Sequence, residues 1–211
     1  MKILTQLLLI VVLLVVYATT LVAFFHPNVT PKYHAYFIDH TLSEWSPKHY
    51  SSDPEQGMHF SKAGLPDWVD GVYGFSFRED WGRWTDGFAT TDPSIAFTQP
   101  FTGQICVYLV AGPAPALVGK SVSVRMGKET ETLPFAGAEP KEYRIPFHLT
   151  GEASRLEFVM SERPPREIDF APNNNDTRRL GIAMSYLAIR RGSCADTTNA
   201  GGKPQLSVKE K

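Results

Sequence analysis

One short segment brings together side chains that could bind a carbohydrate. Glu79, Trp81, Arg83 and Trp84 lie within six consecutive residues, Glu-Asp-Trp-Gly-Arg-Trp. Tryptophan faces stack on the C–H surfaces of sugar rings, and arginine and carboxylate groups form paired hydrogen bonds with hydroxyls. The segment therefore predicts a glycan-binding site, and Asp176, from a second polar segment, is a further candidate ligand-binding residue.

The same residues have a second interpretation as parts of a folded core. Most tryptophans in a domain of this size are at least partly buried. Trp81 and Trp84 could therefore close one end of the core, and Arg83 could form an internal salt bridge. The two interpretations differ in whether these side chains meet solvent, and the sequence leaves both open.

Three consecutive asparagines precede Asp176 in the second polar segment. Their oxygens are of the kind that binds Ca²⁺, but the spacing is unspecific, and such runs are more often plain loops. We therefore expect no metal and no cofactor. The other roles open to Asp176 are support of the backbone where a strand begins and pairing with Arg83.

Recognised catalytic patterns are scarce in this sequence. The six histidines show no metal-ligand spacing, and there is no phosphate-binding loop, Cys-x-x-Cys motif or dinucleotide fingerprint. A glycosidase needs two opposed carboxyl groups, and Glu79 could form such a pair with Asp86 or Asp176. Any β domain contains pairs of carboxylates like these, so the pattern is unspecific. We expect a protein without enzymatic activity; the alternative is a glycan-active enzyme that uses Glu79.

The elements that must position these residues begin with an apolar helix. Residues 3–25 carry no charged side chain, and a helix of that length reaches about 34 Å, enough to cross a hydrocarbon core of about 30 Å. A cleaved signal peptide is the main rival. However, Leu21 occupies the −3 position of the nearest cleavage site, and the apolar run continues through Phe25. We expect a retained membrane anchor over residues 1–25.

Charge and cysteine content bear on the compartment. Lys2 precedes the helix, whereas both signs of charge are mixed after it, which favours a cytoplasmic N-terminus. We expect a single-pass protein of the inner (cytoplasmic) membrane with its C-terminal domain in the periplasm. Cys106 and Cys194 could form one disulfide there, or Cys106 could be a small buried apolar residue. The net charge of −1 argues against a nucleic-acid partner.

The rest of the chain predicts an all-β domain. Short β-rich runs alternate with turn signals, and no helical periodicity lies between them. The predicted strands cover residues 71–77, 94–98, 104–111, 121–125, 129–135, 142–147, 155–160 and 181–190. This pattern predicts a jelly-roll-like β-sandwich. The run at 104–111 is apolar on both faces and should be central, whereas 121–125 should have one wet face.

The predicted organisation has four parts. They are the anchor at residues 1–25, a stalk at 26–56, the β-sandwich at 57–192 and a flexible tail at 193–211. The tail is rich in glycine and lysine, a composition typical of disordered ends.

Several motifs resemble one family of modules. They are MHFS at 58–61, LPDW at 65–68, E-x-WGRWT at 79–85 and DTRRLGIA at 176–183. They resemble the C-terminal β module, a domain of unknown function, of bacterial phosphoglycerol transferases that decorate osmoregulated periplasmic glucans. The transferase half is missing here. The resemblance therefore implies an accessory module without catalytic residues, in which Arg83 and Asp176 lie near one another.

Two functions follow as hypotheses. The first is a membrane-anchored, non-catalytic module of the cell envelope that binds glycan or glycolipid, or assists an envelope-glycan enzyme. The alternative is a structural or protein-interaction subunit of a membrane complex, in which the helix and residues 26–56 contact a membrane-protein partner.

Overall fold

The computed structural model describes residues 2–25, 29, 33, 49–87, 92–169 and 178–195. Asp176, with the asparagines before it, lies outside the described residues. Most of the predicted stalk and tail lie outside them as well.

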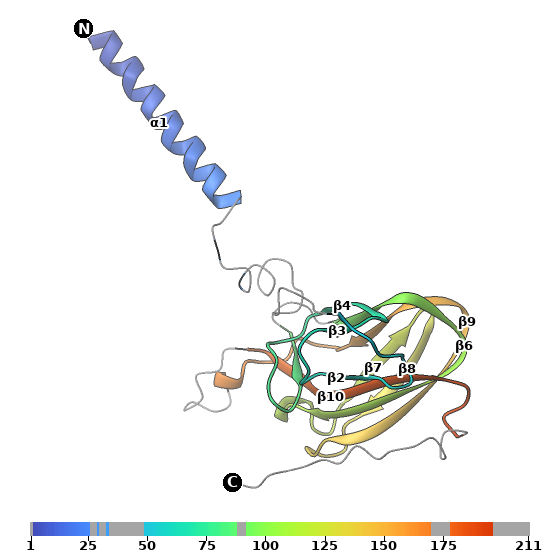
Figure 1. Cartoon of the computed structure of the whole chain (residues 1–211). Coiled ribbons are helices and arrows are strands. Elements are labelled where there is room, and N and C mark those ends of the chain that lie inside the picture. Colours follow the sequence, from blue (N-terminus) through green and yellow to red (C-terminus); the bar gives the residue numbers. More distant parts are fainter. Residues whose placement is uncertain are drawn as a thin grey trace.

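Helix α1 spans Lys2–Phe25 and contains no proline or glycine that would interrupt it. The hydroxyls of Thr19 and Thr20 donate hydrogen bonds to carbonyls one turn earlier, so they are satisfied within the helix. The segment Thr5–Phe24 is long and apolar enough to cross a membrane, and none of it is buried against the rest of the protein. Figure 1 shows α1 outside the β-sandwich.

Ten strands follow in the described part of the chain. They are β1 (His49–Tyr50), β2 (Met58–His59), β3 (Leu65–Pro66), β4 (Val69–Tyr73), β5 (Arg83–Asp86), β6 (Ser94–Pro113), β7 (Ser121–Met126), β8 (Glu129–Pro134), β9 (Lys141–Val159) and β10 (Leu180–Arg191). Two short 3-10 helices, Pro115–Leu117 and Glu167–Asp169, accompany them. Strands β1 and β3 pair in parallel, and the other pairings are antiparallel.

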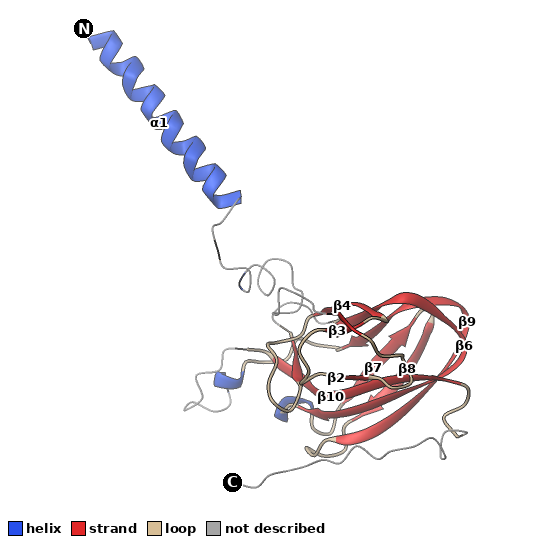
Figure 2. Cartoon of the chain, in the orientation of Figure 1, coloured by secondary structure: helices blue, strands red, loops and turns tan. Residues whose placement is uncertain are grey.

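The strands form two layers that share β6 and β9. One layer contains β4, the first part of β6, the last part of β9, β7 and β8. The other contains β10 between β6 and two short edge strands, β5 and β2, with the first part of β9 on the far side of β6. The predicted all-β sandwich behind one apolar helix is confirmed (Figure 2).

The two long strands correct one part of the sequence interpretation. Four short strands were predicted where β6 and β9 each run through both layers. Their pairing extends from Ser94 with Glu157 to Ala111 with Lys141, with register shifts between Ala96 and Gly103. Gly103 has a φ of +73°, which a glycine adopts without strain. Such irregularities bend a strand pair, so it turns the corner of the sandwich and continues.

Burial follows the predicted alternation. The run at 104–111 is central, as predicted, since it lies between β9 and β10. Its alternate residues Ile105, Val107 and Leu109 are buried in the core between the layers. Val122 and Val124 of β7 also face this core, which confirms the one-sided pattern predicted for that strand.

The two cysteines form a disulfide. Cys106 on β6 and Cys194 just after β10 have Cα atoms 5.0 Å apart and are separated by 88 positions in sequence. Of the two states that the sequence left open for Cys106, the structure contains the paired one.

Candidate functional site

The hairpin formed by β5 and the turn before it carries four of the five predicted site residues, Glu79, Trp81, Arg83 and Trp84. The Ser76 amide donates to the Trp84 carbonyl at 2.8 Å, which sets the two sides of a hairpin. At its tip, the amides of Glu79 and Gly82 each donate to the other residue's carbonyl, at 2.9 and 3.2 Å. Strand β5 was not predicted, because four residues with three polar side chains show no alternation of apolar and polar positions.

Glu79 is held by two donors from opposite ends of the domain sequence. The Trp81 indole Nε1 donates to its Oε2 at 2.9 Å. Nη1 of Arg178 donates to its Oε1 at 3.0 Å and also to the Ser76 hydroxyl at 3.3 Å. The side chains of Arg178 and Glu79 are 27% and 32% exposed, so the ion pair lies at the surface and not in the core.

The two tryptophans of the segment lie edge to face. Their ring centroids are 5.4 Å apart and the planes meet at 78°. Trp81 is 42% exposed and Trp84 is partly buried. Trp84 is the register partner of Ala183, next to the pair of Arg83 with the core residue Met184. Alternating positions face opposite sides of a sheet, so Trp84 lies on the outer side.

Arg83 lies on the inner side of β5 and is only 3% exposed. Its Nη1 donates to the Ser76 carbonyl at 3.3 Å, within the hairpin that carries Trp81. The interpretation of Arg83 as an internal residue therefore agrees with its burial, whereas Trp81 meets solvent. Arg178 is the member of this group that the sequence interpretation did not single out, although it stands in the DTRRLGIA motif.

Side-chain contacts fasten β5 to the start of β10. The Thr85 hydroxyl accepts from the Ile182 amide at 2.7 Å, and Asp86 Oδ1 accepts from the Arg179 amide at 3.2 Å. A Cβ at Gly181 would come within 2.6 Å of the Thr85 hydroxyl, so this close approach requires glycine. These contacts fix the base of the hairpin that carries Glu79 and Trp81.

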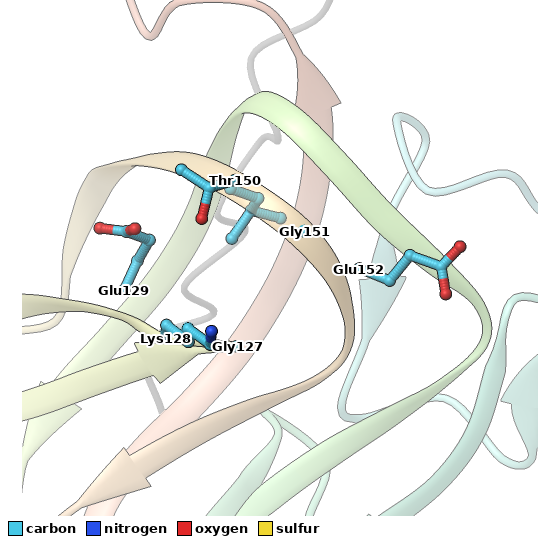
Figure 3. Close-up of a pocket in the computed structure, with 7 residues that line it drawn as sticks. Gly127, Lys128, Glu129, Thr150, Gly151 and Glu152 are labelled. Atoms are coloured by element: carbon cyan, nitrogen blue, oxygen red, sulfur yellow. The ribbon is translucent and has the colours of Figure 1, made fainter.

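A separate small hollow lies between the β7–β8 turn and the corner of β9. It measures about 120 Å³ and is lined in part by Lys128, Glu129, Thr150 and Glu152. Its two carboxylates point in opposite directions (Figure 3). The hollow is well below the roughly 300 Å³ at which small-molecule pockets begin, and it offers no facing acid pair. Within the described ranges, no group of three or more His, Cys, Asp or Glu residues gathers to hold a metal ion.

Comparison with known proteins gives a family match and several relatives. A family model described as "Domain of unknown function (DUF7024)" matches residues 46–191. Phosphoglycerol transferase I of Citrobacter koseri is 29% identical over 133 residues. Proteins of the same name from Escherichia fergusonii and Escherichia coli O139:H28 are 28% and 27% identical over 133 residues.

These relatives are much longer than this chain. Each alignment covers 62% of the chain but only 17% of the relative. The resemblance drawn from the sequence motifs, to one module of phosphoglycerol transferases, is confirmed. Two solved variants of family 29 carbohydrate binding modules each align with a TM-score of 0.37 and 14% identity, covering 63% of this chain and 89% of theirs.

Proposed function

The chain belongs to the DUF7024 family, and we propose that it is a non-catalytic accessory module of the bacterial cell envelope that binds glycan or glycolipid. Helix α1 anchors it in the inner (cytoplasmic) membrane, and the sandwich lies in the periplasm. The apolar helix and the disulfide support this location, because structural disulfides form and persist in oxidising compartments. The alignment with part of bacterial phosphoglycerol transferases supports an envelope role.

The observation that carries the binding function is the fixed exposure of Trp81. Trp81 is 42% exposed, yet Glu79 holds its indole N–H and Trp84 packs against its ring. A ring held in one orientation loses little conformational freedom on stacking against a sugar. Glu79 and Arg178, beside it, supply acceptors and donors for hydroxyls. In this proposal Arg83 supports the hairpin from within, and Asp176 stays a predicted ligand-binding residue.

The test is a titration of the full-length chain, in a neutral detergent, with purified periplasmic glucans and lipopolysaccharide fragments. Saturable binding should fall by up to about tenfold in Trp81→Ala, because aromatic contacts contribute roughly 0.5–1.5 kcal/mol. Trp81→Phe keeps a ring but loses the N–H that Glu79 holds, so its affinity should lie between those of the wild type and Trp81→Ala. Circular dichroism and the unfolding midpoint of each variant establish that the fold is intact.

A folded chain that binds none of these glycans would contradict the proposal. The protein-interaction alternative would then gain weight, because α1 presents an apolar surface that could contact another membrane protein. Extraction in a mild detergent separates the two functions: an interaction subunit should co-purify with one stoichiometric partner.

A further inference from the structure

A second group of side chains lies on the outer face of the layer formed by β10, β6 and β9. Tyr108 is its centre, opposite Ala188 on one side and Arg144 on the other. Alternate β6 residues point into the core, so Tyr108 and its neighbour Cys106 point outward. Both belong to a small apolar cluster on this face. The cluster contains Cys106, Tyr108, Ala188, Tyr186 and Cys194.

Two arginines flank the Tyr108 ring from the strands on either side of β6. The guanidinium carbons of Arg144 and Arg190 lie 5.4 and 4.4 Å from the ring centroid. Nε of Arg144 donates to Glu142 at 3.0 Å. No carboxylate in the described part of the chain forms an ion pair with Arg190. Glu142 and Asp53 are the carboxylates near this cluster, since both act electrostatically on Tyr186, but only Glu142 forms an ion pair with one of the two arginines. Arg190 therefore lies over the Tyr108 ring without an ion-pair partner among the described residues.

The Tyr108 hydroxyl has no hydrogen-bond partner among the described residues, although the residue is only 6% exposed. An unsatisfied buried polar group costs about 1–3 kcal/mol. Packing of arginine stems over a ring would not need this hydroxyl, because phenylalanine would pack equally well. An anionic ligand that accepts a hydrogen bond would satisfy the hydroxyl and pair with Arg190 together.

We propose that this face binds an oxyanion of the phosphate type, held between Arg144 and Arg190 with the Tyr108 O–H as a donor. Planar guanidinium groups donate in pairs to such anions, and this geometry favours them over chloride. The phosphate could belong to a lipid headgroup or to a soluble phosphorylated glycan, and both present the same chemistry.

The oxyanion site is separate from the Trp81 hairpin, so the two proposals can fail independently. Ala183, the partner of Trp84, and Ala188, the partner of Tyr108, are five residues apart along β10. At about 3.3 Å per residue, the two sites are roughly 16 Å apart. A variant at one site therefore leaves the contacts of the other intact.

The experiment follows the unfolding midpoint of the full-length chain in neutral detergent as sodium phosphate is added, against sodium chloride at equal ionic strength. Phosphate should raise the midpoint saturably, and Tyr108→Phe and Arg190→Gln should each weaken its apparent affinity by about tenfold or more. Arg191→Gln removes the same charge from the neighbouring residue and should keep the wild-type response. Equal effects of the two salts, or an unchanged response in Tyr108→Phe and Arg190→Gln, would overturn the proposal.

Two further arms identify the source of the phosphate group. The same titration is made with the chain in nanodiscs of phosphatidylcholine, whose quaternary ammonium masks its phosphate, and in nanodiscs of phosphatidylglycerol. If added phosphate raises the midpoint in phosphatidylcholine nanodiscs but not in phosphatidylglycerol nanodiscs, the lipid headgroup already occupies the site, which assigns it to lipid. Equal responses in both assign it to soluble phosphorylated ligands. No response in either, with the detergent titration also negative, contradicts the site altogether.

Discussion

Trp81 and Glu79 are joined by a hydrogen bond of 2.9 Å from the indole Nε1 to the carboxylate Oε2. The other oxygen of the same carboxylate accepts from Arg178, which lies 99 positions further along the chain. Glu79 therefore connects the exposed ring to the segment that enters β10. The orientation of Trp81 depends on the pairing of two strands that are distant in sequence.

Glu79→Gln should weaken glycan binding while the fold remains intact. Glutamine keeps an oxygen that can accept from Trp81 but removes the charge that attracts Arg178. Because the pair is about a third exposed, we expect a loss of less than about 1 kcal/mol of unfolding free energy. Urea unfolding measures this loss, and Glu162→Gln, which breaks the surface pair with Lys120, is the matched control. Glycan turnover by the wild type that disappears in a folded Glu79→Gln variant would instead establish the enzymatic alternative.

Gly82→Ala should move the hairpin that carries Trp81. A Cβ at this position would collide with the Met184 carbonyl oxygen and crowd the Ser185 backbone. We expect a loss of about 1–3 kcal/mol in unfolding free energy, as for other overpacked sites, together with weaker glycan binding. At Gly137 an added Cβ meets nothing within 4 Å, so Gly137→Ala should stay within about 0.5 kcal/mol of wild type. Equal stability of the two variants would show that the close approach at Gly82 is not constraining.

Loss of the disulfide should destabilise the sandwich without changing its fold. The bridge closes a loop of 88 positions, and removal of such a link typically costs about 2–4 kcal/mol. The double variant Cys106→Ala with Cys194→Ala and the reduced wild type should therefore show the same lowered urea midpoint. A reductant that lowers the wild-type midpoint should leave the double variant unchanged. A reduced wild type as stable as the oxidised one would contradict this prediction.

Alkaline pH should destabilise the domain through three partly buried tyrosines. Burial raises the pKa of Tyr143, and likewise of Tyr186 and Tyr50, above the usual value of 10.0. The folded state therefore favours the neutral phenol. The stability that the neutral phenols contribute to the folded state is fully present below pH 10. It is lost as the pH rises from there through the raised pKa.

Tyr143→Phe isolates one of these groups. The ring of Tyr143 packs edge to face against Phe135, and phenylalanine can keep that contact. Wild type and variant should have similar unfolding midpoints below pH 10, and the variant should be the more stable above it. The check is a set of urea titrations between neutral pH and pH 11 or so. Parallel curves over the whole range would exclude a contribution from the Tyr143 hydroxyl.

The strands with clear alternation were predictable from the sequence, and the corners were not. β7, β8 and β10 begin and end within a residue or so of their predicted bounds, because the turn-forming residues that flank them do end these strands. In β6, Pro100 and Gly103 resemble the residues that end a strand. Whether a strand ends or bends at such residues depends on the strand that pairs with it, and β9 stays paired with β6 on both sides of the corner.

The candidate site was partly predictable for a similar reason. Glu79, Trp81 and Trp84 are close in sequence, so their proximity needed only a local turn. The burial of Arg83 depends instead on which side of β5 it faces, and the exposure of Trp81 depends on where the turn before β5 is held. That is set by the register of β5 with β10, and Arg178 reaches Glu79 through the same pairing. No local pattern encodes a register between segments so far apart.

The position of β10 has a consequence for the order of folding. It lies beside β6 at the centre of its layer, and it is the last strand of the described chain. Its pairing reaches from Ile182 with Pro113 to Arg191 with Ile105. Such long-range pairing forms slowly, so one edge of β6 stays open until the C-terminal strand has emerged. Open edges recruit strands from other chains. Newly made copies that meet one another would therefore be most prone to aggregate during that interval.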